Sequence, residues 1–164
     1  MTVSKEAYRE AMARLGAAVN IVTTNGPAGR RGFTASAVCS VTDDPPTLLV
    51  CVNRTNDSHI VMKRNACVCV NVLTHRQQEL SPVFAGMTGC AIEQRFEAGT
   101  WDTIVTGAPS LVGAAVSFDC RVSQIVEVGT HDVFFCEVEA IRTGSVHEGL
   151  IYFGRAYHRI AQPT

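Results

Sequence analysis

The feature that most constrains the fold is an alternation of apolar and polar residues with a period of two, which starts near residue 18 and recurs toward the C-terminus. In residues 115–128, for example, Val116, Phe118, Cys120 and Val122 alternate with Ser, Asp and Arg side chains. Such alternation gives a β-strand one apolar face. Similar or continuously apolar runs lie at residues 18–24, 31–41, 47–52, 66–73, 132–142, 150–153 and 157–160. Turn-forming residues join several of these runs, which predicts a mainly β fold with largely antiparallel pairing.

Two of the predicted strands matter most for the later argument. The alternation in residues 31–41 predicts one shared face for Phe33, Ala35, Ala37, Cys39 and Val41. Residues 47–52 are too continuously apolar for a strand with one exposed face, so we expect burial on both faces. We favour a barrel over an open sheet, because a barrel leaves no long unpaired edge.

A few short helices are predicted between the strands. Residues 4–15 form one apolar helical stripe that consists of Tyr8, Ala11, Met12 and Leu15. Ser4 is suited to cap this helix and Gly16 to end it. Residues 56–64 and 75–84 also have helix-like patterns. The length of 164 residues is typical of one domain, here residues 1–164.

Composition excludes several classes of protein. With 46% hydrophobic and 18% charged residues, the chain buries a sizeable core and is not disordered. The net charge of −1 provides no overall positive field for nucleic acid or an anionic membrane. Charges near the N-terminus argue against a signal peptide, and no apolar run approaches the roughly 20 residues that span a bilayer. We expect a soluble, cytoplasmic protein whose spare apolar surface is covered by a second copy.

Familiar chemical motifs are missing from the sequence. The seven cysteines include no C-x-x-C pair, and the Cys67-Val68-Cys69 spacing is weak evidence for zinc, so we expect reduced thiols and no metal site. The dinucleotide-binding, phosphate-loop, zinc-protease and nucleophile-elbow motifs do not occur either. If the protein is an enzyme, a cofactor carries the reactive atoms.

Four segments carry a family resemblance: residues 32–41 followed by Asp44-Pro45-Pro46, and residues 50–54, 69–73 and 128–132. In this order they resemble the short-chain flavin reductases of two-component monooxygenase systems. The resemblance implies a split β-barrel, a homodimer, and reduction of FMN or FAD by NADH, with the reduced flavin passed to a separate monooxygenase. Within the family, the chain is most similar to reductases of pyrimidine-degradation systems. Reductases of 4-hydroxyphenylacetate hydroxylases are a near second, so an aromatic hydroxylase remains the alternative partner.

A flavin ring is flat and needs small side chains against its face and hydrogen-bond donors at its polar edge. A stretch of small residues offers both, and its members are Thr34, Ala35, Ser36, Ala37, Val38, Cys39 and Ser40. The alternative interpretation is that these residues let two sheets pack closely. The family resemblance favours the flavin wall.

A second group of candidates precedes a predicted helix. Asn53, Arg54, Thr55 and Ser58 combine hydroxyls, backbone donors and one cation, which suits a phosphate. An ordinary capped helix with a solvated arginine is the alternative. Asn71 lies among apolar residues and needs hydrogen-bond partners, either from a ligand or from the backbone.

The remaining candidates depend on the resemblance. It places His131 near the flavin and the nicotinamide, where the imidazole would bind the flavin or orient NADH; a surface position is the alternative. We expect the aromatic and basic cluster of Tyr152, Phe153, Arg155 and Tyr157 to cover the dinucleotide, although strand packing and a dimer rim explain it equally well. Phe84 opens a further shared segment and is included among the cofactor-binding candidates. A non-catalytic flavin-binding protein stays open as a second alternative, and the preference for NADH rests on the resemblance alone.

Overall fold

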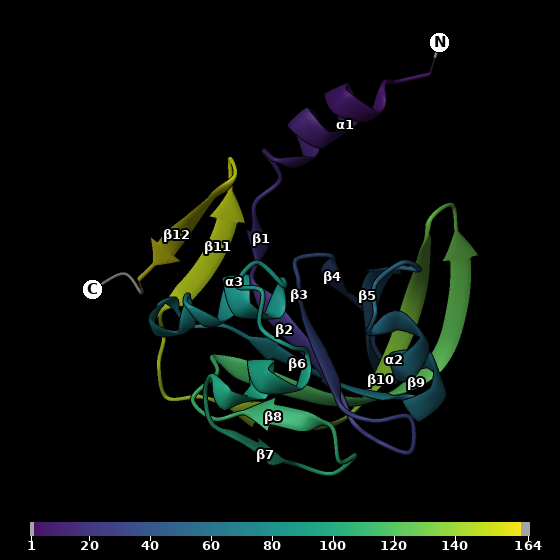
Figure 1. Cartoon of the computed structure of the whole chain (residues 1–164), viewed down its shortest axis with the longest axis vertical. Coiled ribbons are helices and arrows are strands. Elements are labelled where there is room, and N and C mark those ends of the chain that lie inside the picture. Colours follow the sequence, from purple (N-terminus) through teal and green to yellow (C-terminus); the bar gives the residue numbers. More distant parts are fainter. Residues whose placement is uncertain (1, 162–164) are drawn as a thin grey trace.

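The computed structural model describes residues 2–161; Met1 and residues 162–164 of the predicted domain lie outside the described residues. Figure 1 shows a curved β-structure from which helix α1 (Lys5–Met12) projects. The other helical segments are α2 (His59–Asn65), α3 (Leu80–Phe84) and two 3-10 helices, η1 (His75–Gln77) and η2 (Glu93–Glu97). The strands are β1 (Ala17–Ala18), β2 (Asn20–Thr24), β3 (Arg31–Ala35), β4 (Val38–Asp43), β5 (Pro46–Asn53), β6 (Cys67–Val72), β7 (Trp101–Thr103), β8 (Pro109–Leu111), β9 (Val116–Val128), β10 (His131–Thr143), β11 (Gly149–Phe153) and β12 (Ala156–Ile160).

The main sheet has the strand order β3-β2-β6-β9-β10-β5-β4, and every neighbouring pair in it is antiparallel. Its two edge strands, β3 and β4, are separated in the chain by only Ser36 and Ala37. Since this connection spans about 10 Å at most, the sheet has to curl until its edges meet at this corner. The curled sheet confirms the mainly β, split-barrel prediction, with the seam between β3 and β4. A smaller sheet, β1-β11-β12, and the β7-β8 pair complete the described β-structure.

Two large apolar clusters pack against the two faces of the barrel sheet. The first lies inside the curled sheet and is formed by Val22, Phe33, Ala35, Leu48, Val50, Val52, Met62, Val68, Val70, Cys120, Phe134 and Cys136. The second packs α3, η2 and β8 against β2 and β11 and is formed by Val19, Ile21, Leu73, Phe84, Phe96, Leu111, Ala114 and Leu150. Because β2 has a cluster on each face, all five of its residues are buried. By contrast, the outer face of β4 remains open.

The prediction of one continuous strand over residues 31–41 is wrong. The strand breaks at Ser36 and Ala37, where the chain passes from one edge of the sheet to the other. Phe33 and Ala35 are buried inside the barrel, whereas Ala37 and Cys39 are exposed on its outer face. Sequence alternation alone does not reveal this change, because small side chains are compatible with either face.

The helices differ from prediction mainly in length. Ser4 caps α1 as predicted, since its side-chain oxygen accepts a hydrogen bond from the Ala7 amide, but the helix ends at Met12. None of the described residues of α1 is buried. The predicted helix over residues 75–84 is split into η1 and α3. No helix within residues 2–161 is long and apolar enough to cross a membrane.

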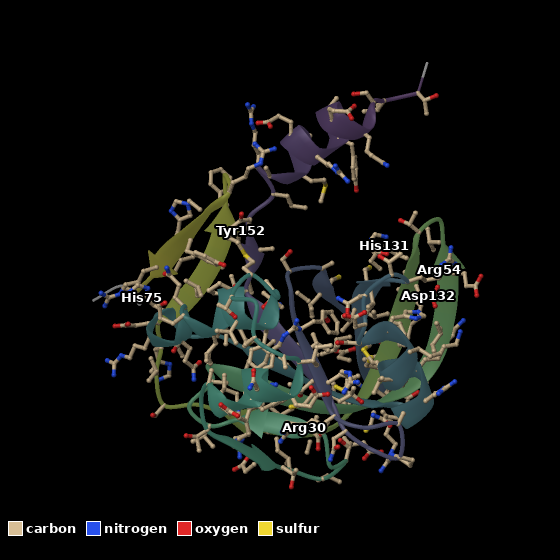
Figure 2. The ribbon with its side chains drawn as sticks, viewed as in Figure 1. Arg30, Arg54, His75, His131, Asp132 and Tyr152 are labelled. Atoms are coloured by element: carbon tan, nitrogen blue, oxygen red, sulfur yellow. The ribbon has the colours of Figure 1, made fainter. Side chains whose placement is uncertain are left out.

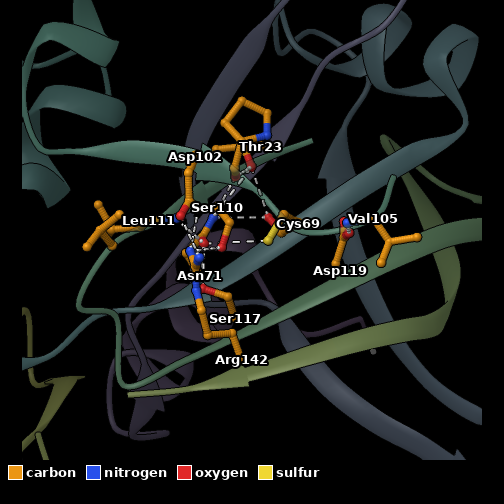
Figure 3. A network of polar contacts seen from close by, with 12 residues as sticks. Thr23, Cys69, Asn71, Asp102, Val105, Ser110, Leu111, Ser117, Asp119 and Arg142 are labelled. Carbon is orange, nitrogen blue, oxygen red and sulfur yellow. Dashed lines mark hydrogen bonds and ion pairs between the residues drawn. The ribbon is translucent and has the colours of Figure 1, made fainter. Parts of the chain in front are cut away.

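Asn71 belongs to a buried polar network that fixes the outer layer to the barrel (Figure 3). Its side-chain oxygen accepts hydrogen bonds from the Leu111 amide and the Ser117 hydroxyl, both at 2.8 Å. Its side-chain nitrogen donates to the Ile21 carbonyl at 3.1 Å. Asn71 is completely buried, and these partners account for its polarity without a ligand.

We expect Asn71→Ala to lower the free energy of unfolding by about 3 kcal/mol, because it leaves buried donors of β8 and β9 without an acceptor. For a chain of this size the midpoint of thermal unfolding should fall by roughly 10 °C. Differential scanning calorimetry measures this shift, and Asn25→Ala, at an exposed position, is the matched control. Equal midpoints for the two variants would contradict the role assigned to the network.

Candidate functional site

A cleft of about 820 Å³ lies beside the outer face of β4 and β5. Its floor consists of Ser36, Ala37, Val38, Cys39, Leu49 and Cys51. Its other wall is formed by α1, β1 and the β11–β12 hairpin, including Tyr152 of β11 and Arg155 of the turn. Figure 2 shows Tyr152 and His131 on opposite sides of the space below α1. The strand pairing places Cys39 opposite Leu49, and the Cys51 amide donates to the Ala37 carbonyl at 3.0 Å, so the floor is one continuous sheet surface.

A second hollow of about 420 Å³ adjoins the cleft. Ser36, Tyr152 and Arg155 line both spaces, and Thr34, Ala35 and Tyr157 line only the second. The hydroxyl groups here are fixed by the protein: Thr34 donates to the Ser81 carbonyl at 2.6 Å, and the Tyr157 and Ser81 oxygens lie 2.8 Å apart. The two spaces therefore form one extended surface with an apolar floor and ordered polar groups at one end.

The β11–β12 turn holds Arg155 at the junction of the two spaces. Gly154 and Arg155 form a two-residue turn, and both have positive φ angles, 59° and 62°. This conformation matches the twist of a tight hairpin, but it costs a non-glycine residue about 1 kcal/mol. The turn is fixed to α1 by a hydrogen bond from the Gly154 amide to the Ala13 carbonyl and by an ion pair between Arg155 and Glu10 at 2.8 Å. A cation is thereby kept at the mouth of the cleft.

His131 lies on the same sheet face as the floor of the cleft. Leu49, Cys51 and Asn53 follow one another at every second position of β5, so their side chains share one face. Asn53 is paired with His131 at the start of β10, and directly paired residues point to the same side. The imidazole is half-buried, and its Nδ1 lies 2.9 Å from the Thr130 hydroxyl. His131 does not line the cleft or the adjoining hollow, but it lies on the same sheet face, beyond Cys51.

A family model for the flavin reductase like domain matches residues 12–161. The chain belongs to this family. It is 60% identical to the FMN reductase (NADH) RutF of Ancylobacter novellus, over 97% of this chain and 87% of that protein. It is 55% identical to RutF of Escherichia coli, over 99% of this chain and 98% of that protein. Among solved structures, a protein of Haemophilus somnus 129PT matches with 44% identity and a TM-score of 0.92, over 96% of this chain and all of the other. The NADH:FAD oxidoreductase SgcE6 of Streptomyces globisporus matches with 26% identity and a TM-score of 0.88, over 99% and 98% of the two chains.

In this flavin reductase like domain, most of the predicted wall lies along the cleft. Residues 36–39 line the larger space, and Thr34 and Ala35 line the smaller one. Ser40 lies beyond them, in a neighbouring hollow of about 390 Å³ at the edge of β4. Of the C-terminal cluster, Tyr152 and Arg155 line both spaces and Tyr157 lines the smaller one, whereas Phe153 is exposed beside His158.

Two further predicted residues, Asn71 and Phe84, lie away from both spaces. Asn71 is in the buried network, and Phe84 packs against Phe96 and Trp101 in the outer core, with ring centroids 5.2 and 5.3 Å away. Neither residue lines the cleft or the adjoining hollow. Hydrogen bonding in the protein and apolar packing are sufficient reasons for their presence, so we leave both out of the proposed site.

The predicted phosphate-binding group is largely engaged by its own chain. The Asn53 side-chain oxygen accepts hydrogen bonds from the Thr55 amide and hydroxyl, at 3.0 and 2.9 Å. Ser58 is buried at the start of α2. The Arg54 guanidinium lies 3.4 Å from Glu127 and 3.6 Å from Asp132. Two carboxylates beside one cation argue against the predicted contact between Arg54 and a phosphate.

Sequence reasoning missed Leu49 and Cys51 as parts of the floor. We expected residues 47–52 to be buried on both faces, but Leu49 and Cys51 are only half-buried. A continuously apolar run contains no alternation from which the open face could be recognised. The open face of β5 is identified by its pairing register with β4, and this register is known only from the folded sheet.

Proposed function

We propose that this protein is an NADH-dependent FMN reductase that releases reduced flavin to a separate monooxygenase. The observation that carries the proposal is the 60% identity, over 97% of the chain, to an FMN reductase (NADH) RutF. The cleft supports it independently, since its volume of about 820 Å³ and its largely apolar floor are typical of a site for a flat organic ligand.

The residues of the cleft suit this chemistry. Ala37, Cys39, Leu49 and Cys51 offer a low apolar surface for one face of the flavin ring. When both are bound, NADH supplies a hydride from nicotinamide C4 and FMN accepts it at N5. Such a transfer depends on how closely the two rings are held, so the task of the protein is mainly one of positioning. His131 borders the floor, where its imidazole orients the nicotinamide, and Arg155 at the mouth faces the charged part of the dinucleotide.

A single assay tests the activity. The purified protein is mixed with NADH and a large excess of FMN, and the absorbance of NADH is followed. Oxidation of many NADH molecules per protein chain is the expected result. Quenching of flavin fluorescence without loss of NADH would instead identify a non-catalytic flavin-binding protein.

For the acceptor of the reduced flavin, we propose a monooxygenase of pyrimidine degradation, because the similar curated proteins are RutF reductases. Reconstitution tests this choice: the protein, NADH and FMN should support oxygen-dependent pyrimidine-ring opening by such a monooxygenase. Support of 4-hydroxyphenylacetate hydroxylation alone would favour the aromatic hydroxylase instead. A cytoplasmic location is also part of the proposal, and it is supported by seven free cysteines.

The predicted homodimer remains part of the proposal. Its support is the apolar stripe of α1 and the following turn, where Tyr8, Met12 and Leu15 are 60%, 42% and 63% exposed. An exposed apolar stripe on a projecting helix is typical of an interaction surface, and we propose that a second copy of the chain buries it.

We expect the wild-type protein to have twice the mass of one chain in light scattering, and Met12→Asp combined with Leu15→Asp to produce a monomer. The two carboxylates would have to be buried in the interface without partners. Val105→Asp, at an exposed loop position, is the control and should stay dimeric. A monomeric wild-type protein would contradict this part of the proposal.

The thiols offer a direct probe of the cleft. Burial raises the pKa values of Cys69 and Cys136 to about 12, so these thiols stay protonated and unreactive at pH 8. Burial, and to a smaller extent the neighbouring Cys39, raises the pKa of Cys51 as well. Cys39 is exposed on the cleft floor, and Cys90 is partly exposed outside it.

We therefore expect iodoacetamide to label Cys39 and Cys90 first at pH 8. Bound FMN should slow the labelling of Cys39 and leave Cys90 unaffected, because the ring covers only the former. Peptide mass spectrometry measures both rates in one sample. Equal rates at Cys39 with and without saturating FMN would place the flavin elsewhere.

A further inference from the structure

His131 forms the last pair between β10 and β5, opposite Asn53, and within residues 2–161 the hairpin tip beyond it has no further strand beside it. The two-residue turn Gly129-Thr130 joins β9 to β10, and Gly129 has a φ of 57°, which glycine adopts without strain. Residues 127–130 are all exposed, and Figure 1 shows the β9–β10 hairpin extending beyond the rest of the sheet. Exposed hairpin tips fluctuate unless specific contacts fix them. Since His131 Nδ1 lies 2.9 Å from the hydroxyl of Thr130 in this tip, the contacts that hold the tip also affect the orientation of the imidazole.

Arg54 makes the contacts that hold it. The Arg54 amide donates to the Thr130 carbonyl at 3.1 Å. Its guanidinium donates to the Gly129 carbonyl and lies 3.4 Å from the Glu127 carboxylate. Arg54, the residue directly after β5, thus connects three positions of the tip to the barrel through its main chain and its side chain.

Asp132 anchors the guanidinium from inside the barrel. Its carboxylate is completely buried, with one oxygen 2.7 Å from His59 Nε2 and the other 3.6 Å from Arg54 Nη1. The latter oxygen has no hydrogen-bond partner among the described residues. His59 accounts for the first oxygen, and the guanidinium is the charged group beside the second, so Asp132 attracts Arg54 from inside the barrel. Figure 2 shows Arg54, Asp132 and His131 together at one end of the hairpin.

The two ion pairs of Arg54 also affect whether it binds a ligand. Its guanidinium is already paired with the carboxylates of Glu127 and Asp132, so a phosphate would have to compete with both of them for this one cation. The bonds from Arg54 point to the turn before His131. We propose that Arg54, held by Asp132, is a positioning residue that fixes His131 for hydride transfer. The inference rests on the proposed reductase function and on the place of His131 in it.

The first experiment compares Arg54→Ala with Arg121→Ala. Arg121 is a suitable control, because it also pairs with a carboxylate, Glu139 at 2.7 Å, on the same two strands but away from the cleft. We expect Arg54→Ala to lower kcat roughly tenfold, since small misplacements at a reacting centre have effects of this size. The dissociation constants of FMN and riboflavin, from fluorescence quenching, should remain similar to those of the wild type. A selective loss of FMN affinity, with riboflavin unaffected, would instead make Arg54 a phosphate ligand and overturn the inference.

A double-mutant cycle asks whether Arg54 acts through His131. If it does, Arg54→Ala should have little further effect on kcat in a protein that already carries His131→Ala. Losses that multiply in the double variant would show that the two residues act independently. Asp132→Asn should lower kcat to the same extent as Arg54→Ala. If Asp132→Asn fails to fold, the cycle of Arg54→Ala and His131→Ala is sufficient to test the inference. The Arg54 side chain is half-exposed, so its removal does not open the core.

Hydrogen–deuterium exchange measures whether Arg54 stabilises the hairpin tip, and it does so without an activity assay. In Arg54→Ala, the amides of residues 127–131 should exchange faster than in the wild type, and in Arg121→Ala they should not. Unchanged exchange would overturn the inference even if the protein is an active reductase. Faster exchange in a protein without NADH oxidation would instead locate the failure in the proposed function.

Discussion

Ala37→Phe is expected to abolish FMN-dependent NADH oxidation while leaving the barrel folded. Ala37 lies at the corner between β3 and β4, on the floor of the cleft, and its side chain is exposed. A phenyl ring at this position extends into the space assigned to the flavin ring instead of into the core. The variant therefore removes the binding surface without the cost of overpacking a buried site.

The measurements for this prediction are the dissociation constant of FMN and the midpoint of thermal unfolding. We expect the dissociation constant to rise by about 100-fold or more, which corresponds to about 2.7 kcal/mol. The midpoint should stay close to that of the wild type. Ala91→Phe makes the same change at an exposed position outside the cleft and should affect neither quantity. Unchanged FMN affinity in Ala37→Phe would show that the flavin does not bind on this floor.

The sequence predicts the strands well because their signal is local. The alternation over residues 115–128 and the apolar stretch over residues 66–73 correspond to β9 (Val116–Val128) and β6 (Cys67–Val72) within two residues at each end. The capping residue Ser4 is likewise predicted from its immediate neighbours. Where one face of an element is buried by the elements next to it, the pattern of side chains is enough to identify it.

The corner at Ser36 and Ala37 could not be predicted in this way. Small residues mark this stretch as suitable for close approach, but they do not indicate that the chain changes from one edge of the sheet to the other. That change follows from the pairing of β4 with β5 and of β3 with β2, which is decided by the whole barrel. The floor of the cleft includes this corner, and only the family resemblance connects its small residues with a flavin.

Arg54 is an example of a site residue whose role could not be predicted from its neighbours in the sequence. Beside Thr55 and Ser58 in the sequence, it has the pattern of a phosphate-binding group. In the structure its guanidinium donates to Gly129, 75 positions away in the chain, and it faces the buried Asp132. A sequence does not reveal contacts between residues so far apart in the chain, and these contacts are the basis of our proposal that Arg54 supports the β9–β10 turn.

The second large effect is expected for His131→Ala, which should lower kcat by roughly 10- to 100-fold. The imidazole lies beside the floor of the cleft, one strand away from Asn53, and is not part of the apolar surface that carries the flavin ring. Its removal should therefore disturb the orientation of the nicotinamide more than the binding of FMN. We expect the dissociation constant of FMN to change less than about threefold, which is under about 0.7 kcal/mol.

The control for this variant is His147→Ala, at an exposed loop position outside the cleft. Steady-state kinetics with varied NADH and fluorescence titration with FMN separate turnover from flavin binding in both variants. Normal turnover in His131→Ala would make this histidine a surface residue, and a parallel loss of FMN affinity would make it a flavin ligand. A loss confined to kcat is the result that assigns His131 to the transfer step, because only an interaction needed in the transition state lowers turnover without weakening the bound flavin.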